Sequence, residues 1–390
     1  MNKMKANNFS IKAGRIDFKY CEVVENEFKE KNIFFELDNG IIPSNEAIAC
    51  VIATFAGTKF DEIHIELPIL EEIKKEIESF TKASVVAPVQ TCKTLVHTDS
   101  NNIILNFSGG FDSLAAIYLI PGNIKLVSID FDGAFKRERI FFERFHPYIL
   151  KTNFRQEKLD RNSWTFMGAG ALLYADYLEA QYNVFGTIFE ATKYHFLPSP
   201  HSANNNNTPP FSFIGLKDIR FLNGLTEVGT VMVVSHYAPE LINGSLCSLS
   251  APKTEKRYRK ETLLDIICRK YNYNIHYEKS EAPERKVNFG ENLPLDFLSF
   301  YIIKNSGIAI ANNTVINIPE DVLNLISKLK LNFYERLNCE FVCGDTFPNN
   351  VTRSYFLQRV SECGILPYTE NDYFEYRMVI DLLDKYHHIY

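Results

Sequence analysis

The feature that most constrains the fold is a regular alternation of apolar, strand-like runs and helical patterns between residues 102 and 189. Strands separated by helical patterns of this length form βαβ units, which build a parallel sheet with helices on both faces. We therefore expect an α/β fold that binds ligands at the carboxyl ends of its strands. The strand-like runs lie at 103–107, 125–132, 148–152 and 183–189, and the helical patterns at 113–120, 136–145 and 164–181.

The flanking regions differ from this middle part. Residues 1–97 combine strand-like runs at 32–37 and 62–67 with helical patterns at 45–56 and 68–80, which predicts a small N-terminal α/β unit. Residues 286–390 have mostly helical patterns. The sequence thus predicts three parts, at 1–97, 98–285 and 286–390. Within the middle part we also expect an Asn- and Pro-rich loop at 198–210, a strand at 230–235 and a helix at 261–271.

Composition limits which binding partners and which cellular compartment we expect for this chain. The chain has 46% hydrophobic residues and a net charge of −6, which indicates a globular protein without a general attraction for nucleic acid. The start MNKMKANNFS has no apolar run of a signal peptide, and no stretch is long and apolar enough to span a membrane. The eight cysteines are scattered without a paired framework. We expect a cytoplasmic protein with reduced thiols and no membrane partner, and a homo-oligomer stays open.

The strongest local signal is the hexapeptide SGGFDS at 108–113, between a buried strand and a helix. Gly109 and Gly110 let the backbone turn sharply and approach an anion, and Ser108 and Ser113 offer hydroxyl donors. The helix N-terminus adds free N–H groups. The carboxylate of Asp112 repels phosphate unless a divalent cation lies between them, which suggests Mg²⁺.

This hexapeptide resembles the SGGxDS signature of the PP-loop ATP pyrophosphatases, also called the adenine nucleotide alpha hydrolase-like family, in the same strand–motif–helix context. The resemblance implies a Rossmann-like sheet that binds ATP and Mg²⁺, with the loop around the pyrophosphate portion. It also implies a reaction in which ATP is split between its α- and β-phosphates. A substrate oxygen becomes adenylated, pyrophosphate leaves, and a nucleophile displaces AMP.

Other positions carry the same resemblance into the nucleotide pocket. In this family the second strand ends at the adenine, so Ile129 and Phe131 are expected to flank the base, although ordinary strand core explains them equally well. Arg161 and Gly186 are similar to a segment of the 7-cyano-7-deazaguanine synthase branch that lines the nucleotide and substrate pocket. Glu190 resembles the acidic residue that helps asparagine synthetases to hold Mg²⁺, and its alternative is a solvated loop carboxylate.

A basic stretch at 253–260 lies just before the helix expected at 261–271. Family members place a lysine there to neutralise the α-phosphate and pyrophosphate as charge develops. Lys260 fits that position best and Lys256 second. The alternative is a solvated basic face.

The family and branch together predict an AMP-forming carbon–nitrogen ligase. Its substrate is a small-molecule carboxylate or a carbonyl-bearing, nucleobase-like compound such as a 7-deazaguanine, and its nitrogen comes from ammonia or an amine. Cys339, Cys343 and Cys363 depart from the four grouped cysteines of the branch, so a structural zinc is not expected. The start Met1-Asn2 lacks the nucleophilic cysteine of glutamine-dependent members.

Two other functions stay open. An RNA-thiolating enzyme of the same fold needs a reactive cysteine, and Cys247 is placed for it, although its apolar flanks predict an inert thiol. A partner protein that senses ATP without turnover is the second. His195 and His201 border the Asn-rich loop as candidate general bases, or as surface decoration.

Overall fold

The computed structural model describes residues 1–90, 100–197, 207–342 and 347–390. The chain forms two compact units. Unit 1 comprises Met1–Ser108, Gly122–Phe185 and Asn206–Ile219, and unit 2 comprises Gly109–Pro121, Gly186–Asn205 and Arg220–Tyr390. The expected loop at 198–210 lies outside the described residues as far as residue 206, as do His201 and Cys343.

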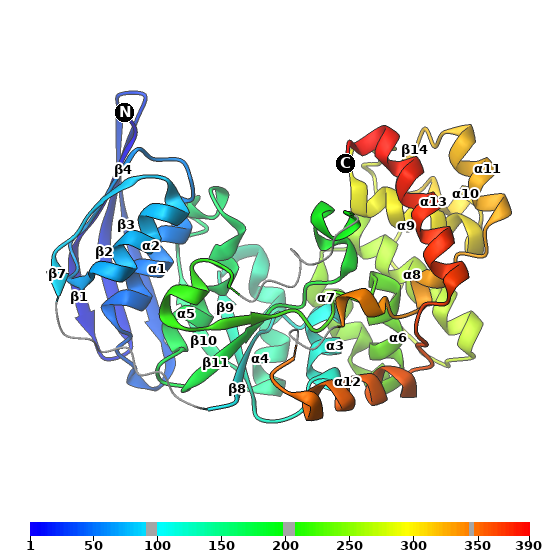
Figure 1. Cartoon of the computed structure of the whole chain (residues 1–390), viewed down its shortest axis with the longest axis horizontal. Coiled ribbons are helices and arrows are strands. Elements are labelled where there is room, and N and C mark those ends of the chain that lie inside the picture. Colours follow the sequence, from blue (N-terminus) through cyan, green and yellow to red (C-terminus); the bar gives the residue numbers. More distant parts are fainter. Residues whose placement is uncertain (91–99, 198–206, 343–346) are drawn as a thin grey trace. The chain divides into compact units, whose positions relative to one another are not determined.

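Unit 1 is built on one sheet of ten strands in the order β12-β11-β8-β9-β10-β3-β2-β1-β4-β6 (Figure 1). The N-terminal strands are β1 (Lys3–Lys12), β2 (Arg15–Val24), β3 (Glu27–Leu37), β4 (Glu62–Ile65) and β6 (Ser84–Val86). The later strands are β8 (Asn102–Asn106), β9 (Ile124–Asp130), β10 (Tyr148–Thr152), β11 (Ala180–Val184) and β12 (Lys217–Ile219). A separate pair joins β5 (Ile69–Leu70) and β7 (Val89–Gln90).

Strands β8 to β12 are all parallel to one another. Their order, β12-β11-β8-β9-β10, places the first strand of this series in the middle, so the chain builds outward from β8 in both directions. This arrangement is compatible with a Rossmann-like fold, in which the strand order reverses beside the first strand. The expected α/β class with a largely parallel sheet is therefore confirmed, and its switch point lies between β8 and β11.

The N-terminal strands continue the same sheet. β3 pairs with β10 antiparallel, β1 to β3 form an antiparallel meander, and β4 runs parallel to β1. The expected N-terminal part at 1–97 thus shares its sheet with the strands that follow residue 98. The residues along β2 are alternately buried and half-exposed, which is the period-two pattern of a sheet covered on one face.

The α-helices described in unit 1 are α1 (Asn45–Ala56), α2 (Glu71–Thr81), α4 (Arg139–Phe145) and α5 (Ala169–Tyr174). α1 occupies the helical pattern expected at 45–56, and the Ser44 side chain caps it by accepting a hydrogen bond from the Ala47 N–H. It ends at Gly57, which has a φ of +50°. A Cβ at Gly57 would lie 2.3 Å from the Asn162 carbonyl oxygen, so a larger residue does not fit there.

The prediction of one long helix at 164–181 is wrong. The segment is a 3₁₀ helix, η4 (Trp164–Gly168), followed by the short helix α5. Close packing explains the break, because a Cβ at Gly168 would lie 2.3 Å from the Phe211 ring and one at Gly170 would lie 2.7 Å from Val127. Trp164, the single tryptophan of the chain, is 54% exposed, and its ring meets Phe185 edge to face at 5.3 Å.

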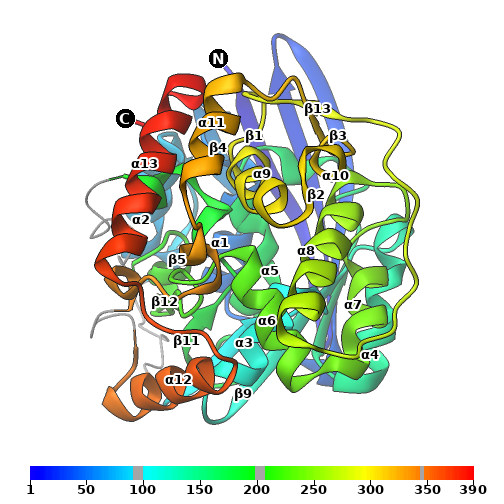
Figure 2. The same ribbon diagram turned by 90° about the vertical axis from the view of Figure 1, so that its right-hand side faces the viewer.

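Unit 2 is mostly helical (Figure 2). Its helices are α3 (Phe111–Leu119), α6 (Glu227–Tyr237), α7 (Ile242–Leu249), α8 (Glu255–Tyr271), α9 (Leu293–Ser306), α10 (Ile308–Ala311), α11 (Glu320–Lys328), α12 (Asn350–Glu362) and α13 (Glu370–His387). A two-stranded parallel pair, β13 (Val287–Asn288) and β14 (Val315–Ile316), completes it. The expected helical C-terminal region is confirmed. Within the described ranges, no helix has both the length and the hydrophobicity needed to cross a membrane.

The prediction of a strand at 230–235 is wrong, because these residues lie inside helix α6. The valine-rich run resembles a strand, but α6 is buried all round, and a helix in that position carries apolar residues on every face. α6 packs against both α3 and α8, which lie beside it in Figure 2. The helix expected at 261–271 begins earlier, at Glu255, with the Thr254 side chain as its N-cap.

Candidate functional site

The SGGFDS segment forms the start of helix α3. Gly109 has a φ of +75°, and Gly110 is the N-cap residue without a side-chain cap. The Ser113 hydroxyl donates a hydrogen bond to the Gly110 carbonyl oxygen at 2.9 Å. The first N–H groups of a helix have no partner within the helix, so an uncapped N-terminus is suited to an anion.

Gly186 packs against this first turn of α3. A Cβ at Gly186 would lie 3.0 Å from both the carbonyl carbon of Asp112 and the backbone nitrogen of Ser113. Backbone atoms cannot move aside as the end of a flexible side chain can. A side chain at position 186 would therefore push against the backbone of the first turn of α3, and glycine avoids this.

Asp112 is the centre of a group of polar side chains. Its Oδ1 accepts a hydrogen bond from the Thr230 hydroxyl at 2.7 Å and lies 3.6 Å from the Lys260 Nζ. The Asp112 side chain is 34% exposed, whereas that of Lys260 is 1% exposed. One end of this pair is therefore open to a ligand and the other end is enclosed by the protein.

Lys260 is held by a second acid. Its Nζ lies 2.9 Å from Glu227 Oε1 and 5.1 Å from the centre of the Phe111 ring. The Lys260 Nζ is itself buried, with the carboxylates of Asp112 and Glu227 as its ion-pair partners. Glu227 also pairs with Arg259, whose Nε lies 2.7 Å from Glu255. Buried charges of both signs thus surround the Asp112 carboxylate.

Two neighbouring glutamates have opposite pKa shifts. Burial raises the pKa of Glu190 to about 8, with a further contribution from the charge of Glu227. Burial alone would also raise the pKa of Glu227, but Arg259 and Lys260 outweigh it and lower that pKa to about 2. The Glu227 backbone N–H donates to Glu190 Oε1 at 2.7 Å. At neutral pH, therefore, Glu227 is an anion and Glu190 a neutral acid.

The two expected metal ligands fit Mg²⁺ unequally. Mg²⁺ in phosphate sites uses one or two carboxylates together with phosphate oxygens and water, which suits the partly exposed Asp112. Glu190 is buried and its Oε1 already accepts a hydrogen bond from the Glu227 N–H, so it is less open to a cation than Asp112, and its role as a metal ligand stays a prediction. Within the described ranges no three His, Cys, Asp or Glu residues are grouped to hold a metal ion by themselves.

Lys256 and Lys260 lie inside helix α8, one turn apart, and not ahead of a helix as expected. Lys256 is exposed and is close enough to Glu227 to help lower its pKa. The basic stretch is thus neither wholly solvated nor wholly buried. Lys260, its last lysine, pairs with Asp112, whereas Lys253, its first lysine, is exposed and pairs with Glu281.

The remaining expected residues belong to unit 1. Ile129 is buried on β9, and the Phe131 ring packs with those of Phe135, Phe154 and Phe166 at centroid distances of 5.2–6.1 Å. Arg161 is exposed at the end of the 3₁₀ helix η3 (Leu159–Arg161). Ser108 also lies in unit 1, at its boundary in the chain. Contact with a nucleotide stays a prediction for all four.

His195 is not on the surface, as a loop histidine was expected to be. It is buried on the 3₁₀ helix η6 (Lys193–Phe196), and burial lowers its pKa to about 4. Its Nδ1 lies 2.7 Å from the Phe189 carbonyl oxygen and its Nε2 lies 3.2 Å from the Asn223 amide nitrogen. Both ring nitrogens are thus engaged, which leaves neither for a general base.

Sequence reasoning missed Glu227, Thr230 and Arg259. The first two were missed because the run at 230–235 was assigned to a strand, which hides the helical spacing between Glu227 and Thr230. The helix start was nevertheless marked, since Thr226 caps α6 with its side chain and is followed at once by an acid, and Pro239 comes shortly after its end. Reading these end signals before the valine run would have found the helix.

Comparisons with known proteins add no family. A scan against protein-family models finds no match, and searches of curated proteins and of solved structures find none either.

Proposed function

We propose that this protein is an ATP-dependent, AMP- and pyrophosphate-forming ligase. It adenylates a carboxylate or carbonyl oxygen of a small molecule, such as a 7-deazaguanine-like base, and ammonia or an amine then displaces AMP. The proposal rests on the resemblance of the SGGFDS segment to the PP-loop signature and on the chemistry around Asp112.

One observation carries the proposal. The resemblance implies that Asp112 binds the Mg²⁺ of a triphosphate and that Lys260 neutralises the charge of the same triphosphate. Their charged groups lie 3.6 Å apart in unit 2, although 148 positions separate them in the chain. An acid for a phosphate-bound cation and a lysine for a leaving pyrophosphate must be neighbours. A merely solvated basic face would not bury the Lys260 side chain against an acid.

In the proposed reaction, the substrate oxygen attacks the α-phosphorus of ATP, the bond to the oxygen that bridges to the β-phosphorus breaks, and pyrophosphate takes the electron pair. A nitrogen nucleophile then displaces AMP from the activated carbon. Mg²⁺ bound between Asp112 and the phosphates would neutralise phosphate charge. Lys260 would stabilise the charge that develops on pyrophosphate, and its burial strengthens this effect because the local dielectric is low.

The other charged groups fit an anionic substrate. Glu227 holds the ammonium of Lys260, with Arg259 on its other side, so the lysine stays in one place during the reaction. Glu190 is neutral at pH 7 and therefore does not repel an incoming phosphate. The uncapped start of α3 offers backbone N–H groups for the same anion.

The test follows the fate of α-labelled ATP with Mg²⁺ and ammonium, in the presence of a panel of small carboxylates or of cell extract. We expect labelled AMP and an equal amount of pyrophosphate only when a particular compound is added. Asp112→Asn and Lys260→Met should each reduce the rate by about 100-fold or more, since each removes a group that stabilises transition-state charge.

Matched controls are Asp176→Asn and Lys75→Met, which make the same changes at exposed positions in unit 1. Asp112 is partly exposed, so Asp112→Asn should keep the fold even if Lys260→Met does not. ADP with orthophosphate as products would overturn the proposal. Tight ATP binding without turnover under any addition would replace it with the sensing function.

A sulfur-inserting enzyme is the second candidate, and one observation favours it. Cys247 is exposed, and its Sγ lies 3.9 Å from the Arg257 guanidinium, so the thiol is accessible beside a positive charge. Under our main proposal Cys247→Ser leaves AMP formation unchanged. Loss of product without loss of ATP binding in this variant would favour sulfur transfer.

A further inference from the structure

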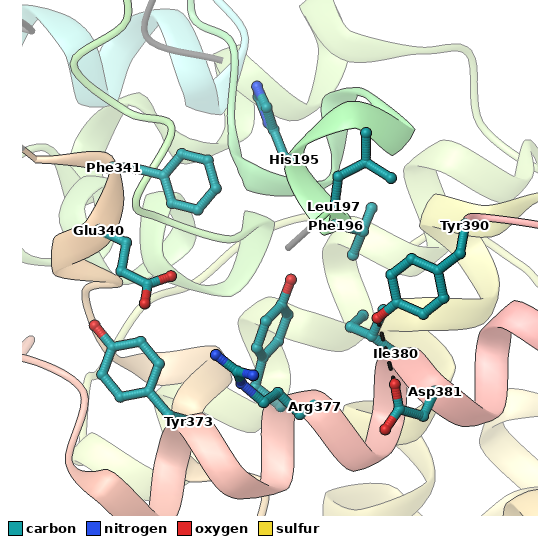
Figure 3. A pocket seen from close by; sticks show the side chains of 11 residues that line it. His195, Phe196, Leu197, Glu340, Phe341, Tyr373, Arg377, Ile380, Asp381 and Tyr390 are labelled. Carbon is teal, nitrogen blue, oxygen red and sulfur yellow. Dashed lines mark hydrogen bonds between the residues drawn. The ribbon is translucent and has the colours of Figure 1, made fainter. Parts of the chain in front are cut away.

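A cavity lies within unit 2 and shares no residue with the Asp112 site (Figure 3). It encloses about 290 Å³, at the lower end of the ~300–1,000 Å³ common for ligand pockets. Its walls come from η6, from the 3₁₀ helix η11 (Cys339–Phe341) and from one face of α13, together with Tyr390. Such a volume suits a small molecule.

The cavity has an apolar, largely aromatic floor. Phe196, Phe341 and Ile380 are each at most 2% exposed, and Tyr376 is 9% exposed. The Phe189 ring lies behind this floor, edge to face with Phe196, Phe341 and Tyr376 at 5.0–5.5 Å. The floor is therefore fixed by packing and does not depend on a ligand for its shape.

Opposite charges stand apart at the rim. Arg377 and Asp381 are four residues apart on α13, a spacing that permits an ion pair, yet the two side chains diverge in Figure 3. Asp381 instead accepts a hydrogen bond from the Tyr390 hydroxyl at 3.3 Å. Across the residues that the structure describes, the Arg377 guanidinium has no ion-pair partner within 4.0 Å. Glu340 supplies a further carboxylate on the other side of the cavity.

His195 belongs to the wall but not to the recognition groups, because both its ring nitrogens are already engaged. Ligand charges must therefore meet Arg377, Glu340 and Asp381. One guanidinium against two carboxylates disfavours a multiply charged anion such as phosphate. A ligand with one negative and one positive group, joined to an apolar body, matches all three features.

We propose that this cavity binds a free α-amino acid with an aromatic or bulky apolar side chain. Its carboxylate pairs with Arg377, its ammonium group lies at Glu340 or Asp381, and its side chain covers the floor at Tyr376 and Phe341. This binding site is additional to the ATP site and is independent of the proposed reaction.

Isothermal titration calorimetry and ligand-observed NMR without ATP test this proposal directly. L-phenylalanine and L-leucine are compared with 3-phenylpropionate, which lacks the ammonium group, and with phenethylamine, which lacks the carboxylate. We expect an amino acid to bind and each singly charged analogue to bind at least about tenfold more weakly.

Variants locate the binding on the cavity. Arg377→Met should weaken amino-acid binding by at least about tenfold, and Glu340→Gln with Asp381→Asn should do the same. Arg377 is exposed, so its loss should not affect folding, and Arg285→Met on an exposed loop of unit 2 is the matched control. No amino-acid binding at concentrations up to ~10 mM overturns the proposal. So does binding that survives Arg377→Met, or equal binding of the singly charged analogues. Because ATP is absent, failure here leaves the ligase proposal untouched.

Discussion

Two sets of charged side chains contrast sharply between the units. On the sheet of unit 1, Lys5 lies 2.6 Å from Glu66 with side chains 45% and 48% exposed, and Lys19 on β2 forms a similarly exposed pair with Glu30 on β3. In unit 2, Lys260, Glu227 and Arg259 form pairs with side chains no more than 11% exposed. The distances are similar, but water screens the first set and is excluded from the second.

The distance between two charged groups therefore does not indicate how much their pairing contributes to stability unless the burial of both side chains is also known. Exposed pairs gain little because solvent already stabilises each partner. Buried partners depend on each other, since neither is solvated when the other is removed. Enclosing charge in this way is costly for folding, and it is usually found where charge is needed for binding or chemistry.

The largest effect is expected for Glu227→Gln, which removes the anion between Lys260 and Arg259. Two buried cations would then lose their shared partner, which should lower the free energy of unfolding by about 3–5 kcal/mol. Urea denaturation at pH 7 followed by circular dichroism measures it. A loss no greater than that of an exposed pair would erase the contrast between the units.

The pH dependence of Glu190 gives the next effect. Its carboxyl has a pKa of about 8 in the folded protein and of 4.5 ordinarily, so between these values the folded state binds more protons than the unfolded state. Stability from this residue therefore falls as the pH rises from 4.5 to 8.

Glu190→Gln should remove that fall, so its stability relative to wild type should increase over this window by an amount on the order of 2–4 kcal/mol. Denaturation curves at pH 5, 6, 7 and 8 for both proteins measure the difference. Parallel pH profiles would show that Glu190 ionises in the fold without cost.

The smallest effect is expected for Lys5→Met on the sheet of unit 1. Its partner Glu66 stays solvated when the lysine is lost, so the midpoint of thermal unfolding should not change measurably. Differential scanning calorimetry at low and at high salt checks this. A drop comparable with that of Glu227→Gln would show that the sheet face is covered in solution, and the contrast would fail.

Some elements followed directly from local chemistry. The helix between Ser44 and Gly57 was readable because both its cap and its end carry their own signals. The strand at 148–152 was likewise found within its bounds. Such elements depend on neighbours in the sequence, which a single chain displays.

Other elements depend on distant packing. The sequence of α6 resembles a strand, and only its packing against α3 and α8 explains why a helix there is apolar on every face. The break before α5 follows from the close approach of the Phe211 ring to Gly168. In the site, Asp112 and Lys260 were found through motif and position. Their link through Glu227 was not, because contacts between separated segments leave no local pattern.

The single tryptophan has a practical consequence for spectroscopy. Trp164 lies in unit 1, with its indole largely in water and one edge against Phe185. Tryptophan emission therefore monitors the melting of unit 1, whereas far-ultraviolet circular dichroism is dominated by the helices of unit 2. If the two signals change at different denaturant concentrations, the units unfold separately, and a two-state analysis does not apply to the whole chain.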